Sequence, residues 1–213
     1  MANFFANSIV VSIKGRPLFQ PLSFEVRPGK FLAIMGPSGS GKSSLLSYMA
    51  GSLQLPLMGS GQLKIENKNI ENLSIENRKV GLLYQDDLLF PHMTVGDNLL
   101  YAISRKGSKT ERIQTVMTSL TKVDLGSYFE RLPETLSGGQ RARVSLLRTL
   151  LSEPKVILLD EPFSKLDKTL RNEFKKFVYG AIERQQIPCV LVTHDKDDAP
   201  TDSDFLNLEA FPI

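Results

Sequence analysis

The segment at residues 36–44, with the sequence GPSGSGKSS, has the residue types and spacing that bind phosphate. The pattern Gly-x-x-x-x-Gly-Lys-Ser lets backbone N–H groups approach phosphate oxygens closely. Lys42 can contact the β- and γ-phosphates of a nucleotide, and Ser43 can ligate Mg²⁺. The residues assigned to this phosphate loop are Gly36, Pro37, Ser38, Gly39, Ser40, Gly41, Lys42, Ser43 and Ser44. A Gly/Ser turn that merely joins two elements is the alternative, and a strand before the loop and a helix after it argue against that.

Two adjacent carboxylates, Asp160 and Glu161, follow four apolar residues and therefore lie at the end of a predicted buried strand. Side chains alternate in direction along a strand, so the two carboxylates can have different roles. Asp160 can hold Mg²⁺ through water, and Glu161 can orient or deprotonate the water that attacks the γ-phosphate. For an isolated Asp-Glu pair, a solvated acidic strand end would be the better interpretation.

A second glycine cluster lies at residues 136–140, with the sequence LSGGQ, and a predicted helix follows at residues 141–151. Helix N-termini attract anions, so this cluster indicates a second anion site. Taken alone, it could also be only a glycine-rich helix start.

The elements that must position these residues alternate between strands and helices. A buried strand is predicted at residues 31–35 and a helix at 42–50, on either side of the phosphate loop. Further predictions are antiparallel strands at 8–14 and 21–26, a loop at 53–61 rich in Pro, Gly and Ser, a strand and turn at 62–69, and a buried strand at 79–84. The chain therefore begins with a sheet-forming part.

Residues 85–151 have helical periodicity, as Ile113, Val116, Met117 and Leu120 show, and are predicted to form an inserted helical subdomain. Strands return at 155–160 and 188–193, with a helix between them that has Phe174 on its apolar face. Strand, helix and strand in this order predict a parallel sheet. Residues 202–213 are predicted to form a final strand and a short end.

Composition limits the classes of function. A chain of 213 residues with 41% hydrophobic residues can bury one large core. The net charge, 26 − 23 = +3, is too small to indicate nucleic acid or an anionic membrane surface as the main ligand, and no nucleic-acid partner is expected. The single cysteine, Cys189, fits a reducing compartment, and no secretion signal or membrane span is evident. A cytoplasmic protein is expected, which reaches a membrane only by docking on another protein.

The motifs LSGGQ, GPSGSGKSS and VILLDE together resemble the ATP-binding subunit of ABC transporters, and the likeness covers residues 8–198. It implies an α/β fold of the P-loop NTPase class: a mostly parallel, RecA-like core sheet, an antiparallel β subdomain and an inserted α-helical subdomain. The chain would be one ATPase domain over residues 1–213, with 1–84 and 152–213 as its catalytic core and 85–151 as its helical subdomain. ATP and Mg²⁺ are the implied cofactors.

The resemblance also implies roles for single residues. Gln85 stands where the family has a glutamine that touches Mg²⁺ and the attacking water, and it would act with Glu161, His194 and Lys42 in catalysis. His194 matches the switch histidine that contacts the γ-phosphate. Residues 164–167 stand at the D-loop, and Asp167 is counted with the nucleotide contacts. The implied metal ligands are Ser43, Gln85 and Asp160.

The implied partners are a second copy of the chain and a membrane permease. In the family, two copies pack head to tail, so that each ATP lies between the phosphate loop of one copy and Ser137, Gly138, Gly139 and Gln140 of the other. Residues 88–95 resemble a segment of bacterial importer subunits, so the permease would dock on Gln85 and on the stretch from Leu89 to Val95. Alternatively, these side chains cover the subdomain's own core. A solute-binding protein would be a separate chain.

The sequence departs from the family at the adenine end of the site. An aromatic residue usually stacks on the base, whereas this chain has Ile13 at that place, and either Ile13 or Phe19 would have to cover the base instead. Lys165 replaces a small residue in the D-loop.

The function expected from the resemblance is an ATPase that drives solute import from the inner face of the cell membrane. An exporter or lipid-releasing ATPase, a soluble ABC protein without a transport role, and a nucleotide-binding protein with weak turnover are the alternatives.

Overall fold

The computed structural model describes residues 3–104, 106–209 and 211, and these residues form two compact units. The first unit comprises the described residues of Met1–Leu82, Lys155–Glu161 and Tyr179–Ile213, and the second comprises those of Leu83–Pro154 and Pro162–Val178. Residues 162–178, predicted to belong to the catalytic core, are grouped by their contacts with residues 83–154. Of the tail predicted at 202–213, residues 210, 212 and 213 lie outside the described residues.

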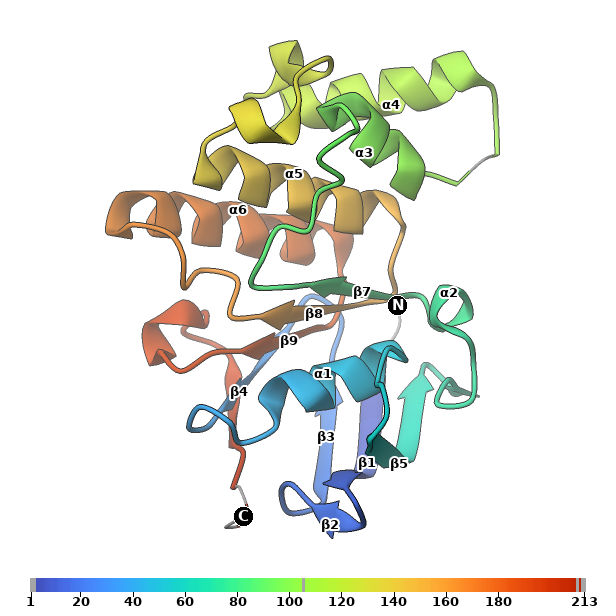
Figure 1. The fold of residues 1–213 in the computed structure, drawn as a ribbon, viewed down its shortest axis with the longest axis vertical. Helices are drawn as coiled ribbons and strands as arrows, with labels where there is room; N and C mark the ends of the chain where they lie inside the picture. The colour runs from blue at the N-terminus through green and yellow to red at the C-terminus, as the bar shows by residue number, and fades with distance from the viewer. Residues whose placement is uncertain (1–2, 105, 210, 212–213) are drawn as a thin grey trace. The chain divides into compact units, whose positions relative to one another are not determined.

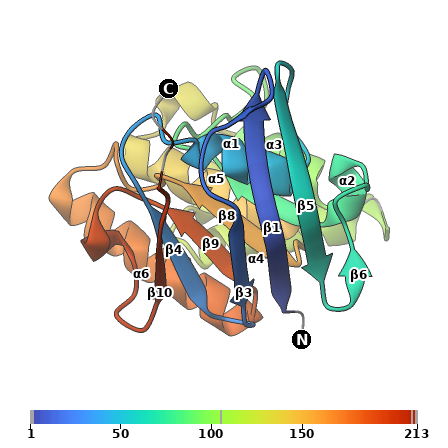
Figure 2. The ribbon, with the colours of Figure 1, turned by 90° about the horizontal axis from the view of Figure 1, so that it is seen from below.

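An antiparallel sheet forms the first layer of the first unit. Its strands are β1 (Phe4–Ile13), β2 (Arg16–Pro17), β3 (Leu22–Val26), β5 (Leu57–Ile65) and β6 (Lys68–Asn69). Strand β1 pairs with both β3 and β5, and Figure 2 shows it between them. The strands predicted at 8–14 and 21–26 are thus confirmed, although β1 begins four residues earlier.

A second sheet, in the order β10-β4-β9-β8-β7, has parallel pairing along β10, β4, β9 and β8. Its strands are β4 (Phe31–Met35), β7 (Val80–Leu83), β8 (Val156–Asp160), β9 (Cys189–Val192) and β10 (Asp204–Asn207). The central strands are apolar and buried along almost their whole length, as is typical of a sheet covered on both faces. The α/β fold with a parallel core sheet, an antiparallel β part and a helical region is therefore confirmed.

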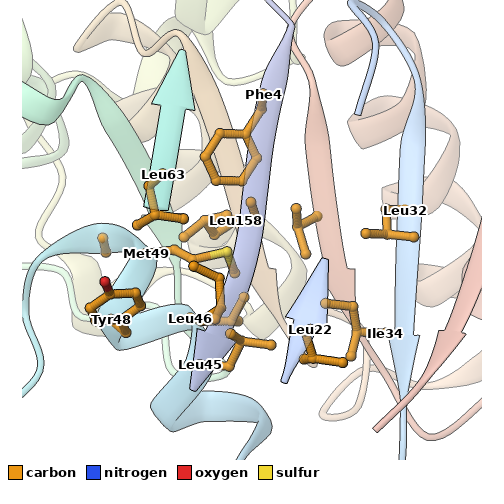
Figure 3. Packing of buried hydrophobic residues seen from close by; sticks show 14 of the residues in the cluster. Phe4, Leu22, Leu32, Ile34, Leu45, Leu46, Tyr48, Met49, Leu63 and Leu158 are labelled. Carbon is orange, nitrogen blue, oxygen red and sulfur yellow. The ribbon is translucent and has the colours of Figure 1, made fainter. Parts of the chain in front are cut away.

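Helix α1 (Lys42–Ala50) lies in contact with strands of both sheets, and Figure 3 shows the core that results. Leu45, Leu46 and Met49 of α1 meet Phe4 and Leu158 from the two sheets, all less than 2% exposed. This packing fixes α1, and with it the phosphate loop that precedes the helix. The short helix α2 (Ile75–Arg78) precedes β7.

The loop predicted at residues 53–61 is wrong in its second half, because β5 begins at Leu57. Two glycines that suggested a loop are required by close packing instead. A Cβ on Gly59 would lie 2.0 Å from Cδ2 of Tyr48, and a Cβ on Gly61 would lie 2.6 Å from the carbonyl oxygen of Ser8. Glycine in a strand often marks such an approach.

The second unit is helical and has its own core. It contains α3 (Val95–Ala102), α4 (Lys109–Thr121), α5 (Gly138–Leu151) and the short 3₁₀ turns Gly126–Tyr128 and Pro133–Thr135. Figure 1 shows α3, α4 and α5 beside one another, and Leu99, Leu120 and Val144 pack between them with no exposed surface. The predicted face of α4 is confirmed at Val116 and Leu120.

Helix α6 (Lys168–Gln185) links β8 to β9, as predicted, and a 3₁₀ turn (Lys196–Asp198) follows β9. Its first residues belong to the second unit and its last to the first unit. In the described part of the chain, we find no helix long and apolar enough to cross a membrane.

Candidate functional site

The phosphate loop curls around the ammonium group of its own lysine. Lys42 Nζ donates hydrogen bonds to the carbonyl oxygens of Gly36 and Pro37, both at 2.8 Å. The loop turns into α1 at Gly41, whose φ is +94° and whose Cβ would lie 3.1 Å from the Phe19 ring. Glycine therefore fits this position, because it tolerates the left-handed backbone conformation and leaves room for the Phe19 ring below the loop.

The remaining loop residues face outward or line the loop. Pro37, Ser38, Gly39 and Ser43 are exposed, whereas Gly36 and Ser44 are half-buried. Ser40 is 2% exposed, and its hydroxyl has no hydrogen-bond partner among the described residues. A buried polar group without a partner costs roughly 1–3 kcal/mol, and a phosphate oxygen accepting from Ser40 would offset that cost.

Asp160, the last residue of β8, lies beside the first turn of α1. Its carboxylate is hydrogen-bonded to the Ser43 hydroxyl. Burial raises the pKa of the Asp160 carboxyl above its ordinary value, while the Ser43 hydrogen bond and the charge of Lys42 act in the opposite direction. A cation beside Asp160 would favour its ionised form.

Glu161 lies next to His194 because β8 and β9 are neighbours in the parallel sheet. The backbone N–H of Glu161 donates to the carbonyl oxygen of Val192 at 3.0 Å, and Glu161 Oε2 lies 3.3 Å from Nδ1 of His194. The backbone of Glu161 has φ +44°, an unfavourable value for a residue with a side chain. The Glu161 side chain is 23% exposed and can still reach a water molecule or a ligand.

Hydrogen bonds hold the turn that carries His194. Thr193 Oγ1 donates to Oδ2 of the buried Asp198 at 2.8 Å, and the N–H of Asp195 donates to Thr193 Oγ1 at 3.1 Å. His194 itself is exposed. The turn is therefore fixed while its histidine is free to meet a ligand.

The donor set fits a nucleotide-bound Mg²⁺. Among residues 3–104, 106–209 and 211, no three His, Cys, Asp or Glu side chains gather as a metal site would require. Mg²⁺ needs fewer protein ligands, since it keeps several waters and binds substrate phosphates. Ser43 and the partly desolvated Asp160 supply such a pair of oxygens.

At the adenine end, Phe19 is excluded as a cover for the base because it is fully buried beneath the loop. Ile13, at the end of β1, is 37% exposed and stands opposite Arg16 in the β1–β2 ladder. Of the two residues considered from the sequence, only Ile13 offers surface to a ligand.

In the second unit, the glycine cluster forms the start of α5. Ser137 is the N-cap: its hydroxyl accepts from the N–H of Gln140, and Gln140 Oε1 accepts from the N–H of Ser137. Gly139 is buried against Leu170, whereas Gly138 is exposed with open space where a Cβ would project. The capping box thus leaves the Gly138 side of the helix start uncovered.

Gln85 and residues 164–167 lie together in the same unit. Gln85 Nε2 donates to Ser164 Oγ at 3.1 Å, and Lys165 forms an ion pair with Asp86. Asp167 directly precedes α6, with its carboxylate accepting from the N–H groups of Thr169 and Leu170 at 3.0 and 3.1 Å. Asp167 therefore has a capping role in addition to the nucleotide contact predicted for it.

Sequence reasoning missed two residues that organise these sites. Arg78 is 7% exposed and donates to the carbonyl oxygens of Tyr48 and Met49 at the end of α1. Asp87 accepts from Arg141 Nε at 2.8 Å, and its carbonyl oxygen accepts from Ser145. These partners lie at least 29 positions away in the sequence, so no local pattern could have identified the contacts.

The chain is similar to known proteins over most of its length. Residues 19–164 match the family model described as ABC transporter. The chain is 44% identical over 191 residues to the "Uncharacterized ABC transporter ATP-binding protein YnjD" of Escherichia coli (strain K12), and the match covers 90% of this chain and 88% of that protein.

Proposed function

Because the chain belongs to the ABC transporter family, whose ATP-binding, ATP-hydrolysing subunits work with a membrane permease, we propose that it energises solute import through such a permease. The arrangement of Asp160, Glu161 and His194 beside the phosphate loop carries the catalytic part of this proposal. On this proposal the subunit is cytoplasmic and docks on the inner face of the membrane, and the permease and a solute-binding protein are separate chains.

In the proposed reaction, the phosphate loop binds the triphosphate, and Lys42 moves from the Gly36 and Pro37 carbonyls to the β- and γ-phosphates. Ser43, Asp160 and Gln85 would hold Mg²⁺, which supplies charge neutralisation when bound. Glu161 accepts a proton as water attacks the γ-phosphorus and the bond to the β-phosphate oxygen breaks, releasing ADP and phosphate.

His194 would keep the Glu161 carboxylate oriented, since the two side chains lie 3.3 Å apart, and would contact the γ-phosphate. In the proposed homodimer, ATP also meets Ser137, Gly138, Gly139 and Gln140 of the other copy. The exposure of Gly138 at the start of α5 supports this, because a helix N-terminus attracts anions. ATP would then join the two copies, and hydrolysis would loosen them.

The proposed permease surface lies in the second unit, around residues 88–101. Leu88 and Tyr101 are 52% and 69% exposed, and the half-buried ring of Phe90 packs edge-on against Tyr101 at 5.2 Å. A groove of about 480 Å³ beside Tyr101 is lined by Met93, Asp97, Leu100, Ile103 and Arg112. Exposed aromatic and aliphatic side chains beside a groove are typical of a protein-binding surface.

Two residues of the expected surface belong instead to the core of the unit. Leu89 is 8% exposed and Val95 is fully buried, so the expectation of a continuous docking stretch from Leu89 to Val95 is wrong at these positions. Asn98, also fully buried, binds the backbone of residues 90–94 through four hydrogen bonds. The side chains that remain outside are therefore held on a fixed backbone.

The catalytic assignment is tested by Glu161→Gln, with Glu183→Gln, an exposed change on α6, as its control. Removing a general base reduces turnover by about 10²–10⁴-fold. We expect this loss at Glu161 with ATP binding retained, and an ATP-bound dimer that persists in size-exclusion chromatography. Wild-type turnover in the Glu161 variant would contradict the assignment.

The permease surface is tested by cross-linking from a single introduced thiol. Cys189 is fully buried and burial raises its pKa, so it stays unreactive. Tyr101→Cys should cross-link to an integral membrane protein in native membranes, whereas Phe205→Cys, at a residue 49% exposed in the first unit, should not. Cross-links from Tyr101→Cys to ribosomes or DNA-bound proteins would support a role outside transport.

The direction of transport is tested with the permease complex in proteoliposomes, oriented with this subunit outside. Stimulation of its ATPase by solute-loaded binding protein sealed in the lumen would support import. Stimulation by solute added on the side of this subunit would support export.

A further inference from the structure

Three consecutive side chains, Gln85, Asp86 and Asp87, are each tied to another part of the second unit. Gln85 donates to Ser164 and Asp86 pairs with Lys165, so two of the ties reach residues 164–167. The third, from Asp87 to Arg141, reaches α5. The Gln85 segment (residues 84–87) is thus connected to both neighbouring motifs by polar contacts.

Packing contributes little to the position of the Gln85 segment. Tyr84 is 40% exposed, and Gln85 and Asp86 are exposed as well. A cavity of about 250 Å³ beside the segment is lined by Leu83, Arg141, Ser145, Pro162, Lys165 and Phe174, among others. A segment with solvent on one side and a cavity on the other has few dispersion contacts. Its position therefore depends mainly on its hydrogen bonds and ion pairs.

The tie to Ser164 also determines which atom of the Gln85 amide is available. An amide has a donor nitrogen and an acceptor oxygen, and the nitrogen is the atom bound to Ser164. The oxygen therefore points away from Ser164 as the group that can ligate a cation or accept from water. A rotation of the amide would present the nitrogen instead, which cannot ligate Mg²⁺.

We propose that Lys165 is a positioning residue for hydrolysis: its ion pair with Asp86 holds the Gln85 segment against Ser164, so that the Gln85 amide keeps its oxygen free. This inference rests on the proposed function, because it takes Gln85 as the residue that meets Mg²⁺ and the attacking water. In this proposal Lys165 acts through its ion pair with Asp86 and not by contact with substrate or metal. The sequence showed Lys165 only as a departure from the family pattern.

The size of the effect follows from the exposure of the pair. The side chains of Lys165 and Asp86 are 55% and 67% exposed. Exposed ion pairs have modest coupling, which corresponds to about a two- to fivefold change in an equilibrium. Salt screens such pairs, because the Debye length falls to about 3 Å at 1 M ionic strength.

The experiment compares steady-state ATP hydrolysis of Lys165→Ala, Asp86→Ala and the charge exchange Lys165→Asp with Asp86→Lys. We expect each single variant to lower kcat about two- to fivefold and to raise the Mg²⁺ concentration for half-maximal activity, with KM for ATP unchanged within about twofold. The charge exchange and Lys165→Arg should restore both values. Wild-type kcat should fall toward that of Lys165→Ala as salt increases.

Lys30→Ala is the matched control, because Lys30 and Asp202 form an equally exposed pair, 57% and 60%, in the first unit. It should leave kcat and Mg²⁺ dependence unchanged, with a melting temperature similar to that of Lys165→Ala. Unaltered kcat in Lys165→Ala, or failure of both Lys165→Arg and the charge exchange to restore it, would overturn the proposal. Absence of Glu161-dependent turnover in the wild type would instead refute the proposed function.

Discussion

Replacing Gly138 by alanine separates what the chain needs in order to fold from what the proposed dimer needs. Gly138 is the first residue of α5, and a Cβ built on it comes no closer than 4.0 Å to a heavy atom outside its chain neighbours and the helix's own backbone, the nearest being Nη2 of Arg141. Its φ is not positive, so alanine can take the same backbone conformation. Nothing among the residues that the structure describes therefore requires glycine at this position.

We expect Gly138→Ala to stabilise the fold but to weaken ATP-dependent association. Gly-to-Ala changes at compatible sites stabilise a protein by about 0.4–1 kcal/mol, which corresponds to a rise of about 1–4 °C in the melting temperature of a chain this long. In the proposed dimer, the new methyl group would face the nucleotide of the second copy. Overpacking costs about 1–3 kcal/mol, which weakens ATP-dependent association roughly 5- to 150-fold.

The assay uses the Glu161→Gln background, in which we expect ATP to remain bound with little turnover. Dimerisation is followed by light scattering at increasing ATP concentration, and stability by thermal unfolding without nucleotide. Gly180→Ala in α6 is the control, because its Cβ meets only the flexible end of Arg184, at 3.1 Å. It should give a similar gain in stability with unchanged dimerisation.

Two results would refute this reasoning. A lower melting temperature for Gly138→Ala would mean that the chain's own fold needs the glycine. ATP-dependent dimerisation equal to that of the parent would mean that Gly138 does not face the nucleotide of a second copy. A loss confined to Gly138→Ala, with Gly180→Ala unaffected, is the expected outcome.

Two further predictions concern the scaffold of the phosphate loop. Asp160→Asn should raise the melting temperature at neutral pH, because burial raises the pKa of Asp160 and the ionised carboxylate is disfavoured in the fold. This gain should vanish below the ordinary aspartate pKa of about 3.9, where the carboxyl is protonated in folded and unfolded chains alike; a gain that persists at acidic pH would point to another cause. Arg78→Ala should lower stability by about 3 kcal/mol, or about 6–12 °C, because it removes the buried guanidinium that donates to the carbonyl of Met49 and, together with the Gly51 N–H, to that of Tyr48 at the end of α1. Arg78→Lys should recover only part of the loss in urea unfolding, and full recovery would show that charge alone is needed.

The elements next to the phosphate loop were predictable because local signals agree there. The apolar run at 31–35 became β4 and the helix predicted at 42–50 became α1, with the same limits. A buried strand in a parallel sheet has a continuous apolar sequence. A Gly-Lys pair directly before a helix, at this spacing, is typical of a phosphate loop and of few other structures. Propensity, burial and turn chemistry point to one structure in this stretch.

The strand predicted at residues 62–69 matches the second half of β5, but its first half, residues 57–61, was missed because glycines there lower strand propensity. Gly59 and Gly61 weaken a strand in isolation, yet the Tyr48 ring and the backbone of Ser8 leave no room for a side chain at these positions. The requirement comes from side-chain and backbone atoms of α1 and β1, which lie outside the segment itself. From composition alone, residues 57–61 are predicted to form a loop.

The positions of Phe19, Leu89 and Val95 could not be read from the sequence for a related reason. Each belongs to an apolar segment near a site, and only packing decides whether a side chain faces a ligand or the core. Phe19 fills the space under Gly41, and Leu89 and Val95 complete the helical core. Residue type indicates apolar surface, whereas the fold determines which surface is exposed.

Unfavourable features gather at one place in the first unit, where β4 and β8 end. Ser40 has a buried hydroxyl without a partner among the described residues, Asp160 is a carboxylate with a raised pKa, and Glu161 has a positive φ. Each of them lowers stability, and a chain selected for stability alone would replace them. A phosphate oxygen would satisfy Ser40 and a cation would favour the ionised Asp160. Because independent costs at one site are relieved by the same kind of ligand, their coincidence supports a triphosphate site more strongly than any single motif does.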